Sequence, residues 1–368
     1  MIYFDNAATT FPKPKCVYRS VIECIKTYCG NPGRSSHALS VRSEEEIYRA
    51  REAVASFLNI KNPEYVVFTE NATHALNIAI KTAIPDNSHV IISNIEHNSV
   101  LRPLSALAKS KGVTFSVFSV GGDVEKEISS LIQDNTSAVI CSLMSNVNGH
   151  LTDMKLISDI CHRNSLLFIA DASQKIGHFN IDLANTPCDI LCAPAHKALF
   201  GIQGAGFAVM CDGKVRESFM EGGGGSESMN ISMPEYLPDR YEAGTLPTPS
   251  IVSLRSGIDF INSIGLGNIA DHINKLTAYA TEILISHKKT SFLSGEGGVI
   301  SFNIGSVPAS ECAAFFDKNG ICTRAGLHCA PLAHKMLSTE NDGTVRISFS
   351  YFNTLSEIDT FYKVLKDM

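Results

Sequence analysis

Two short apolar segments, residues 166–170 and 190–195, have the length and the boundaries of buried parallel strands. Each is followed by polar side chains that could do chemistry, namely Asp171, Gln174, His196 and Lys197. In open α/β sheets, ligands bind at the carboxyl ends of the strands. A lysine amine that can form a Schiff base, beside a carboxylate that keeps a pyridine nitrogen protonated, suits pyridoxal 5′-phosphate (PLP). Asp171 with Gln174 alone would indicate a helix cap or a turn, and His196 with Lys197 alone would indicate a solvated loop. The two pairs together favour this cofactor.

The stretch 166–207, with its glycine-rich GIQGAG, resembles the core of the class V aminotransferase superfamily of fold type I PLP enzymes. Within that superfamily it is most similar to the cysteine desulfurase and selenocysteine lyase branch. The resemblance implies that Asp171 partners the pyridine nitrogen and Gln174 contacts the phenolic oxygen. It also implies that Lys197, preceded by His196, forms the Schiff base. The similarity extends over nearly the whole chain.

Length and composition agree with a large two-domain protein. The chain has 368 residues, of which 44% are hydrophobic, enough to bury a sizeable core. The resemblance implies a large α/β domain over residues 15–250, with a mostly parallel seven-stranded sheet flanked by helices. A smaller α+β domain would comprise residues 1–14 and 251–368. Hydrophobic periodicity predicts one clear amphipathic helix over residues 43–58, with acids in its first turn.

Charge and cysteine usage narrow the classes of protein. The net charge is −6 and no basic cluster occurs, which disfavours nucleic-acid binding. No apolar run approaches the roughly 18 residues of a membrane span, and no signal-peptide pattern is seen. Eleven cysteines without regular spacing indicate reduced thiols in a cytoplasmic protein. The sequence contains no CxxC, HExxH or Walker motif.

Three further segments match cofactor-binding positions of the family. Ala72 and Thr73 open a predicted helix, whose N-terminus can bind an anion or can simply be capped. The resemblance places the PLP phosphate there. It also implies that His97, just past a predicted strand, stacks on the pyridine ring and moves protons, and that Asn146 lies near the phenolic oxygen.

Other loops match family positions near the substrate and the subunit interface. The opening DNAATT implies that Asn6 and Ala7 lie near the substrate. The loop GNPGRSSHALS, with Arg34 and His37, resembles one that reaches the partner subunit's site. Thr245, in EAGT, would cross to the other subunit's phosphate, so the resemblance implies a homodimer.

Pro194 departs from the family pattern. The family usually has Ser or Thr three residues before the lysine, where the hydroxyl helps to hold the phosphate. Proline offers neither a hydroxyl nor an N–H. The phosphate affinity is then lower, or another donor substitutes, and the sequence leaves both possibilities open.

A second reactive segment, ICTRAGLHCAPLAH, contains Cys329 near Arg324 and His328. Nearby cations lower the pKa of a thiol toward its reactive thiolate. The family motif R-x-G-x-H-C-A implies that this cysteine accepts sulfur from the substrate, and its compact form resembles the type II branch. A metal site is the structural alternative, but its ligand spacing fits no common zinc pattern: Cys322, His328, Cys329 and His334.

Arg346, within a predicted strand, matches the family arginine that binds the substrate carboxylate, a task suited to a bidentate guanidinium.

The resemblance therefore implies a PLP-dependent cysteine desulfurase. It would convert L-cysteine to L-alanine, leave a persulfide on Cys329 and pass the sulfur to an acceptor protein. Selenocysteine lyase acting on L-selenocysteine, another reaction on the same cofactor, and a catalytically degenerate dimeric scaffold are the alternatives.

Overall fold

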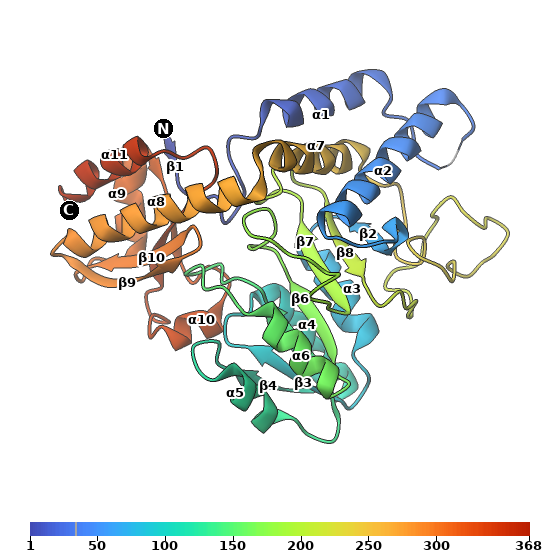
Figure 1. The fold of residues 1–368 in the computed structure, drawn as a ribbon, viewed down its shortest axis with the longest axis horizontal. Coiled ribbons are helices and arrows are strands. Elements are labelled where there is room, and N and C mark those ends of the chain that lie inside the picture. The colour runs from blue at the N-terminus through green and yellow to red at the C-terminus, as the bar shows by residue number, and fades with distance from the viewer. Residues whose placement is uncertain (34) are drawn as a thin grey trace.

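A seven-stranded sheet forms the centre of this computed structural model, which describes residues 1–33 and 35–368 (Figure 1). The strand order is β2-β8-β7-β6-β5-β3-β4, and β8 alone runs antiparallel to its neighbours. This confirms the mostly parallel seven-stranded sheet. The strands are β2 Val66–Thr69, β3 His89–Ser93, β4 Thr114–Phe118, β5 Thr136–Ser142, β6 Leu167–Asp171, β7 Ile190–Pro194 and β8 Gly206–Met210.

The strand register explains why the polar side chains after β5, β6 and β7 meet. Ser142 lies opposite Asp171 across β5 and β6, and Asp171 lies opposite Cys192 across β6 and β7. Because these strands are parallel, their carboxyl ends share one edge of the sheet. The connecting helices are α3 Ala72–Ala83, α4 Asn98–Lys111, α5 Val124–Leu131 and α6 Met154–Arg163.

The helix predicted over residues 43–58 begins five residues earlier than expected. In the structure it is α2 (Ala38–Phe57), and the His37 ring caps it by accepting a hydrogen bond from the Ser40 backbone N–H. The first turn consequently contains no acidic residue, so the prediction of acids there is wrong. Histidine is not among the preferred N-cap residues, which is why the start could not be read from the sequence.

A smaller α+β unit is built mainly from the C-terminal part of the chain. Its four-stranded antiparallel sheet has the order β12-β13-β10-β9. The N-terminal strand β1 (Ile2–Tyr3) pairs with β11 (Ile321–Cys322), so the chain starts in this unit before reaching the large one (Figure 1). The predicted boundaries between the two domains remain a prediction. The remaining strands are β9 Thr290–Glu296, β10 Val299–Ile304, β12 Arg324–Gly326 and β13 Thr344–Ser348.

Helices join and cover the two units. Long α7 leads directly into α8, which crosses the sheet of the smaller unit, while α1 and α2 pack against α7 (Figure 1). None of the described helices is long and apolar enough to cross a membrane. These helices are α1 Lys15–Thr27, α7 Thr248–Ile264, α8 Leu266–Ser286, α9 Ala309–Lys318, α10 Pro331–Met336 and α11 Leu355–Leu365, with a 3-10 turn, η1, at Pro63–Tyr65.

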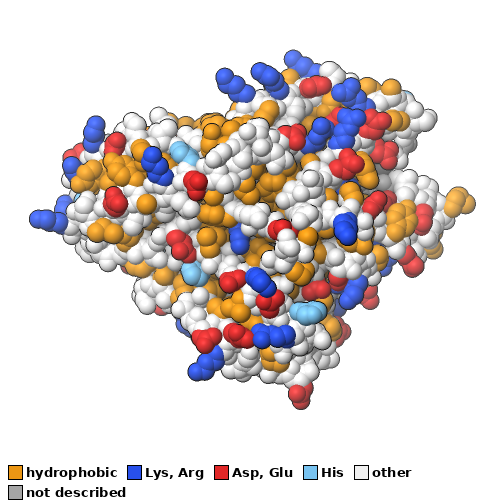
Figure 2. Space-filling model, viewed as in Figure 1, with side chains coloured by type: hydrophobic (Ala, Val, Ile, Leu, Met, Phe, Trp, Pro, Cys, Tyr) orange, Lys and Arg blue, Asp and Glu red, His pale blue; other side chains and the backbone are white. Residues whose placement is uncertain are grey.

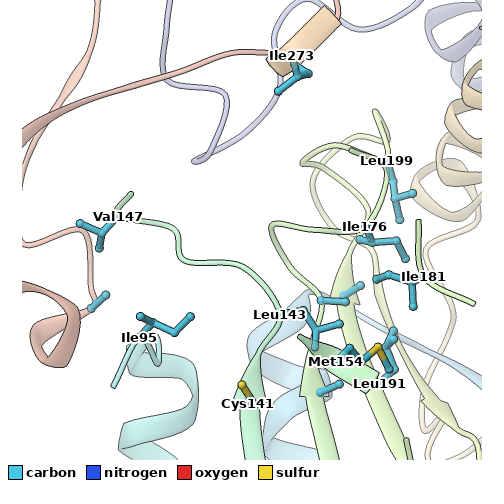
Figure 3. Close-up of a cluster of buried hydrophobic side chains, with 14 of the residues drawn as sticks. Ile95, Cys141, Leu143, Val147, Met154, Ile176, Ile181, Leu191, Leu199 and Ile273 are labelled. Carbon is cyan, nitrogen blue, oxygen red and sulfur yellow. The ribbon is translucent and has the colours of Figure 1, made fainter. Parts of the chain in front are cut away.

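One large hydrophobic cluster runs from the central sheet into the smaller unit. Figure 3 shows part of it, with Leu143 and Leu191 from the large sheet region and Ile273 from α8. Burial of this apolar surface is the main force that holds the strand ends in place. On the face drawn in Figure 2, acidic and basic side chains are interspersed rather than gathered by sign.

Candidate active site

A cavity of about 240 Å³ lies at the carboxyl ends of β5, β6 and β7. It brings together most of the side chains that the sequence singled out, although they come from widely separated parts of the chain. The predicted site residues in its lining are Ala7, Ala72, Thr73, His97, Asn146, Asp171, Gln174, His196, Lys197, Arg324, Cys329 and Arg346.

Asp171 and Lys197 occupy neighbouring strand ends in this cavity. Asp171 closes β6, is 5% exposed, and accepts a hydrogen bond from the Ser173 backbone N–H at 2.9 Å. Burial lowers the pKa of Lys197 to about 8, while the Asp171 charge opposes that shift. Roughly a tenth of Lys197 is therefore the neutral, nucleophilic amine at pH 7, far more than for an ordinary lysine. Gln174 donates to the Ala7 carbonyl at 3.0 Å, which ties the N-terminal segment to this edge.

The N-terminal segment also fixes the backbone at His196 and Lys197. The His196 carbonyl accepts hydrogen bonds from the Thr10 N–H at 3.1 Å and from the Lys13 Nζ at 2.8 Å. The Lys197 carbonyl accepts one from the Thr10 hydroxyl at 2.6 Å. Sequence reasoning did not single out Thr10 or Lys13, because only the fold brings residues 10 and 197 together.

One end of the cavity has the donors that an anion needs. The Asn71 side chain caps α3 by accepting from the His74 N–H at 2.9 Å. The backbone N–H groups of Ala72 and Thr73 have no partner among the described residues. His196 Nδ1 is also buried without a partner in the described part of the chain. These groups suit a phosphate at a helix N-terminus, even though Pro194 in the same lining supplies no hydroxyl.

His97 is both a cap and a cavity residue. Its ring accepts a hydrogen bond from the Ser99 backbone N–H at 3.1 Å at the start of α4, and it lines the cavity. Burial, followed by the charge of Lys197, lowers the pKa of His97 to about 4. The imidazole is therefore neutral at pH 7.

The Arg346 guanidinium is fully buried and is hydrogen-bonded on two sides. Its Nη2 contacts Asp5 Oδ1 at 2.7 Å, and its Nη1 donates to the Asn146 carbonyl at 2.8 Å. The Nε atom has no partner within the described ranges. Asp5 was not identified from the sequence, since its pairing with a residue of β13 arises only in the fold.

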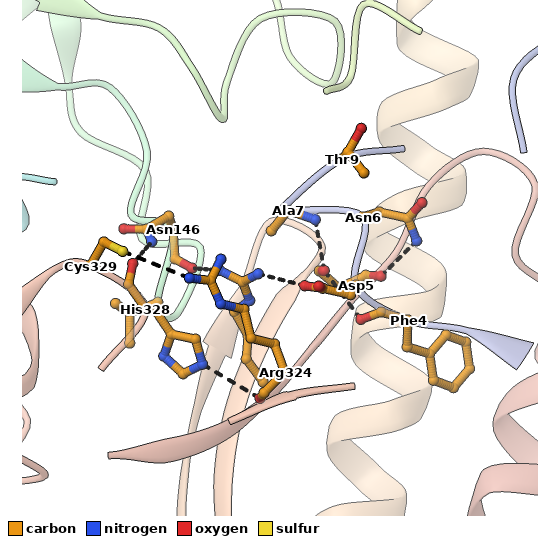
Figure 4. A network of polar contacts seen from close by, with 12 residues as sticks. Phe4, Asp5, Asn6, Ala7, Thr9, Asn146, Arg324, His328 and Cys329 are labelled. Atoms are coloured by element: carbon orange, nitrogen blue, oxygen red, sulfur yellow. Dashed lines mark hydrogen bonds and ion pairs between the residues drawn. The ribbon is translucent and has the colours of Figure 1, made fainter. Parts of the chain in front are cut away.

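Cys329 lies on a short loop that hydrogen bonds hold against the cavity (Figure 4). Arg324 Nη2 lies 3.7 Å from Cys329 Sγ, so a guanidinium cation lies beside the sulfur atom. His328 and Cys329 both have positive φ angles, 49° and 58°. The Asn146 side chain donates to the His328 carbonyl at 2.7 Å, and the Asn98 N–H donates to the Cys329 carbonyl at 2.7 Å.

The residues of the alternative metal site do not point at a common centre. His328 Nδ1 faces His334 Nε2 at 3.1 Å, and His334 Nδ1 contacts the Thr339 hydroxyl at 2.8 Å. Within residues 1–33 and 35–368, no group of three or more His, Cys, Asp or Glu side chains is arranged to hold a metal ion. The rings of the two histidines instead stack on each other.

Of the predicted residues that the structure describes, Asn6, His37 and Thr245 do not line this cavity. The Asn6 amide is buried and donates to the Ser348 carbonyl at 2.9 Å. His37 caps α2, and Thr245 lines a neighbouring cavity that shares Asn71 and His196 with the first. Arg34 lies outside the described residues. The binding roles of these four residues remain predictions.

The chain is similar over its whole length to several known proteins. A protein from Methanothermobacter thermautotrophicus named a probable cysteine desulfurase is 34% identical, covering 100% of this chain and 94% of its own. A probable cysteine desulfurase from Borreliella burgdorferi is 29% identical over 100% of this chain and 92% of its own. The apo structure of a cysteine desulfurase from Thermococcus onnurineus matches with a TM-score of 0.90 at 29% identity, covering 100% and 94%.

The fold expected from the sequence is confirmed by these structural matches. An Escherichia coli cysteine desulfurase structure has the same fold, with a TM-score of 0.89 at 22% identity over 99% of this chain and 94% of its own. The family model described as aminotransferase class-V matches residues 2–361. The chain therefore belongs to the class V aminotransferase family.

Proposed function

We propose that this protein is a PLP-dependent cysteine desulfurase, which converts L-cysteine to L-alanine and retains the sulfur as a persulfide on Cys329. The observation that carries the proposal is the presence of Cys329, beside the Arg324 guanidinium, in the same cavity as Lys197 and Asp171. The names of the relatives support this activity, and they do not favour selenocysteine lyase.

The residues present fit PLP. Lys197 is the amine that would hold it covalently, and Asp171 would stabilise its protonated pyridine nitrogen. The N–H groups of Ala72 and Thr73 and the His196 Nδ1 atom, which have no partner among the described residues, would bind its phosphate. When bound, PLP supplies an electron sink next to the Cα atom of an amino acid.

The chain's own groups then divide the remaining work. Arg346 is placed to fix the substrate carboxylate, with its positive charge held toward the cavity by Asp5. Lys197 Nζ can take a proton when it is in its neutral form, which the lowered pKa of about 8 makes accessible near neutral pH. Cys329 Sγ would receive the substrate's sulfur atom, with the Arg324 guanidinium in contact with that sulfur.

We also propose a homodimer in which Thr245 and His37 contribute to the partner subunit's site, and an acceptor protein that takes sulfur from Cys329. Cys329 is exposed as well as lining the cavity, which supports transfer from the site to a second molecule.

The test is alanine formation from L-cysteine by the PLP-loaded protein. Lys197→Ala should abolish alanine formation and the visible absorbance of the bound cofactor, whereas Cys329→Ala should keep the absorbance and lose sulfur transfer. The matched control is Cys16→Ala, because Cys16 is also exposed but lies outside the cavity lining. Full sulfur transfer by Cys329→Ala would refute the proposed role of that residue.

A further inference from the structure

Three side chains form a hydrogen-bonded row where the N-termini of α3 and α4 meet the cavity. The Thr73 and Ser99 hydroxyl oxygens are 2.8 Å apart, and the Ser99 oxygen lies 2.9 Å from His97 Nδ1. All three residues line the cavity. The proposed function uses Thr73 and His97 but gives Ser99 no role.

The backbone of Ser99 determines which ring nitrogen of His97 carries a proton. The Ser99 N–H lies 3.1 Å from His97 Nδ1, and a backbone N–H can only donate. Nδ1 must therefore present its lone pair. A neutral imidazole has one protonated and one unprotonated nitrogen, so the proton of neutral His97 belongs on Nε2.

The surroundings of His97 keep the ring neutral. Burial is the largest cause of its lowered pKa, and the positive charges that face it act in the same direction. The Asp171 carboxylate raises the pKa of His97, but less than the other causes together lower it. The charged groups that face the ring are Lys197, Arg324 and Arg102, which lower the pKa, and Asp171, which raises it.

The Ser99 hydroxyl adds a second contact without changing this outcome. It has one proton for two neighbours, Thr73 Oγ1 and His97 Nδ1. If Thr73 donates to an anion in the cavity, the Ser99 hydroxyl donates to Thr73, and the backbone N–H alone occupies Nδ1. In the opposite arrangement, the hydroxyl and the N–H both donate to Nδ1. Either way, Nδ1 remains an acceptor.

We propose that Ser99 is a positioning residue that fixes His97 as the tautomer protonated on Nε2. His97 then presents its Nε2–H to the cavity as a hydrogen-bond donor. Nε2 has no hydrogen-bond partner in the described part of the chain, so it is the nitrogen left for a ligand. A neutral Nε2–H can donate a hydrogen bond, but it cannot accept a proton at that atom. For the reaction, which rests on the proposed function, His97 is then a hydrogen-bond donor and Lys197 the proton acceptor.

The test is nitrogen NMR of the full-length chain labelled with ¹⁵N-histidine at pH 7, with the His97→Asn variant used to assign the His97 signals. We expect a pyridine-type shift for Nδ1 and a pyrrole-type shift for Nε2. The reverse pattern, or pyrrole-type shifts for both nitrogens, would overturn the proposal. This readout is independent of turnover, so it stands whether or not L-cysteine is converted.

Two variants separate the contributions of the Ser99 backbone and hydroxyl. Ser99→Ala keeps the N–H and removes the hydroxyl, so the tautomer should persist whichever neighbour the hydroxyl donates to. Ser99→Thr keeps both groups and should leave the Nδ1 shift near its wild-type position. A reversed tautomer in Ser99→Ala would overturn the argument that the backbone N–H alone fixes the proton on Nε2.

Discussion

Replacing Asp5 by Asn tests whether the buried Arg346 depends on its ion pair. The side chain of Arg346 is 1% exposed and that of Asp5 is 21% exposed, with 2.7 Å between Nη2 and Oδ1. Exposed ion pairs contribute about 0–1 kcal/mol, whereas breaking a buried pair costs about 3–5 kcal/mol. Asparagine keeps a neutral acceptor, and Asp5 is partly solvated. We therefore expect a loss of about 2 kcal/mol of unfolding free energy.

The assay is urea unfolding, with the midpoint compared at constant slope. For a urea slope of about 3 kcal/mol per M, a loss of about 2 kcal/mol lowers the midpoint by about 0.7 M. The matched control is Asp159→Asn in α6, where the Lys155–Asp159 pair has a similar distance of 2.9 Å but side-chain exposures of 68% and 55%. Its midpoint should move very little. A wild-type midpoint for Asp5→Asn, or an equal drop for both variants, would refute the reasoning.

Four further predictions follow from single features of the site. The pKa of Lys197 is lowered to about 8, so the rate of covalent PLP attachment to the cofactor-free protein should fall about tenfold per pH unit below pH 8 and level off above it. Stopped-flow absorbance would measure this rate, and a rate that does not change with pH would contradict the prediction. Pro194→Ser adds a hydroxyl to the cavity lining and should tighten PLP binding about tenfold in an equilibrium titration, whereas unchanged affinity would show that other donors already suffice. His97→Gln, whose amide can still donate, should retain more activity than His97→Asn, which keeps only the cap; equal activities would argue against a donor role. Gly149→Ala should destabilise the protein by more than 1 kcal/mol in thermal or urea unfolding, since φ is +74° and the new Cβ would lie 1.8 Å from the Glu296 carbonyl oxygen.

Most of the central sheet could be predicted, because buried parallel strands leave a direct signal in the sequence. The apolar runs before Asp171 and His196 became β6 and β7 with shifts of only one residue. The order and adjacency of the strands also placed both polar groups at one edge. The likeness to a known family supplied the roles of the residues in the cavity, which periodicity alone does not give.

The residues missed are those whose partners are distant in the sequence. Asp5 pairs with Arg346 over 341 positions, and Lys13 contacts the His196 carbonyl over 183. Nothing local distinguishes Asp5 from an ordinary turn residue. Asn6 shows the opposite case. The sequence places it near the substrate, but in the structure its side-chain amide donates to the Ser348 carbonyl inside the protein. Side-chain contacts with residues so distant in the sequence form only once the chain has folded.

The most direct test of the proposed activity is to locate the sulfur after reaction with L-cysteine. The PLP-loaded protein would be reacted once, alkylated, digested and examined by mass spectrometry across its eleven cysteines. The proposal predicts one added sulfur atom on the peptide that contains Cys329, formed together with alanine and absent in Lys197→Ala. Sulfur on a different cysteine, or alanine formed with no sulfur on Cys329 at any time, would contradict it.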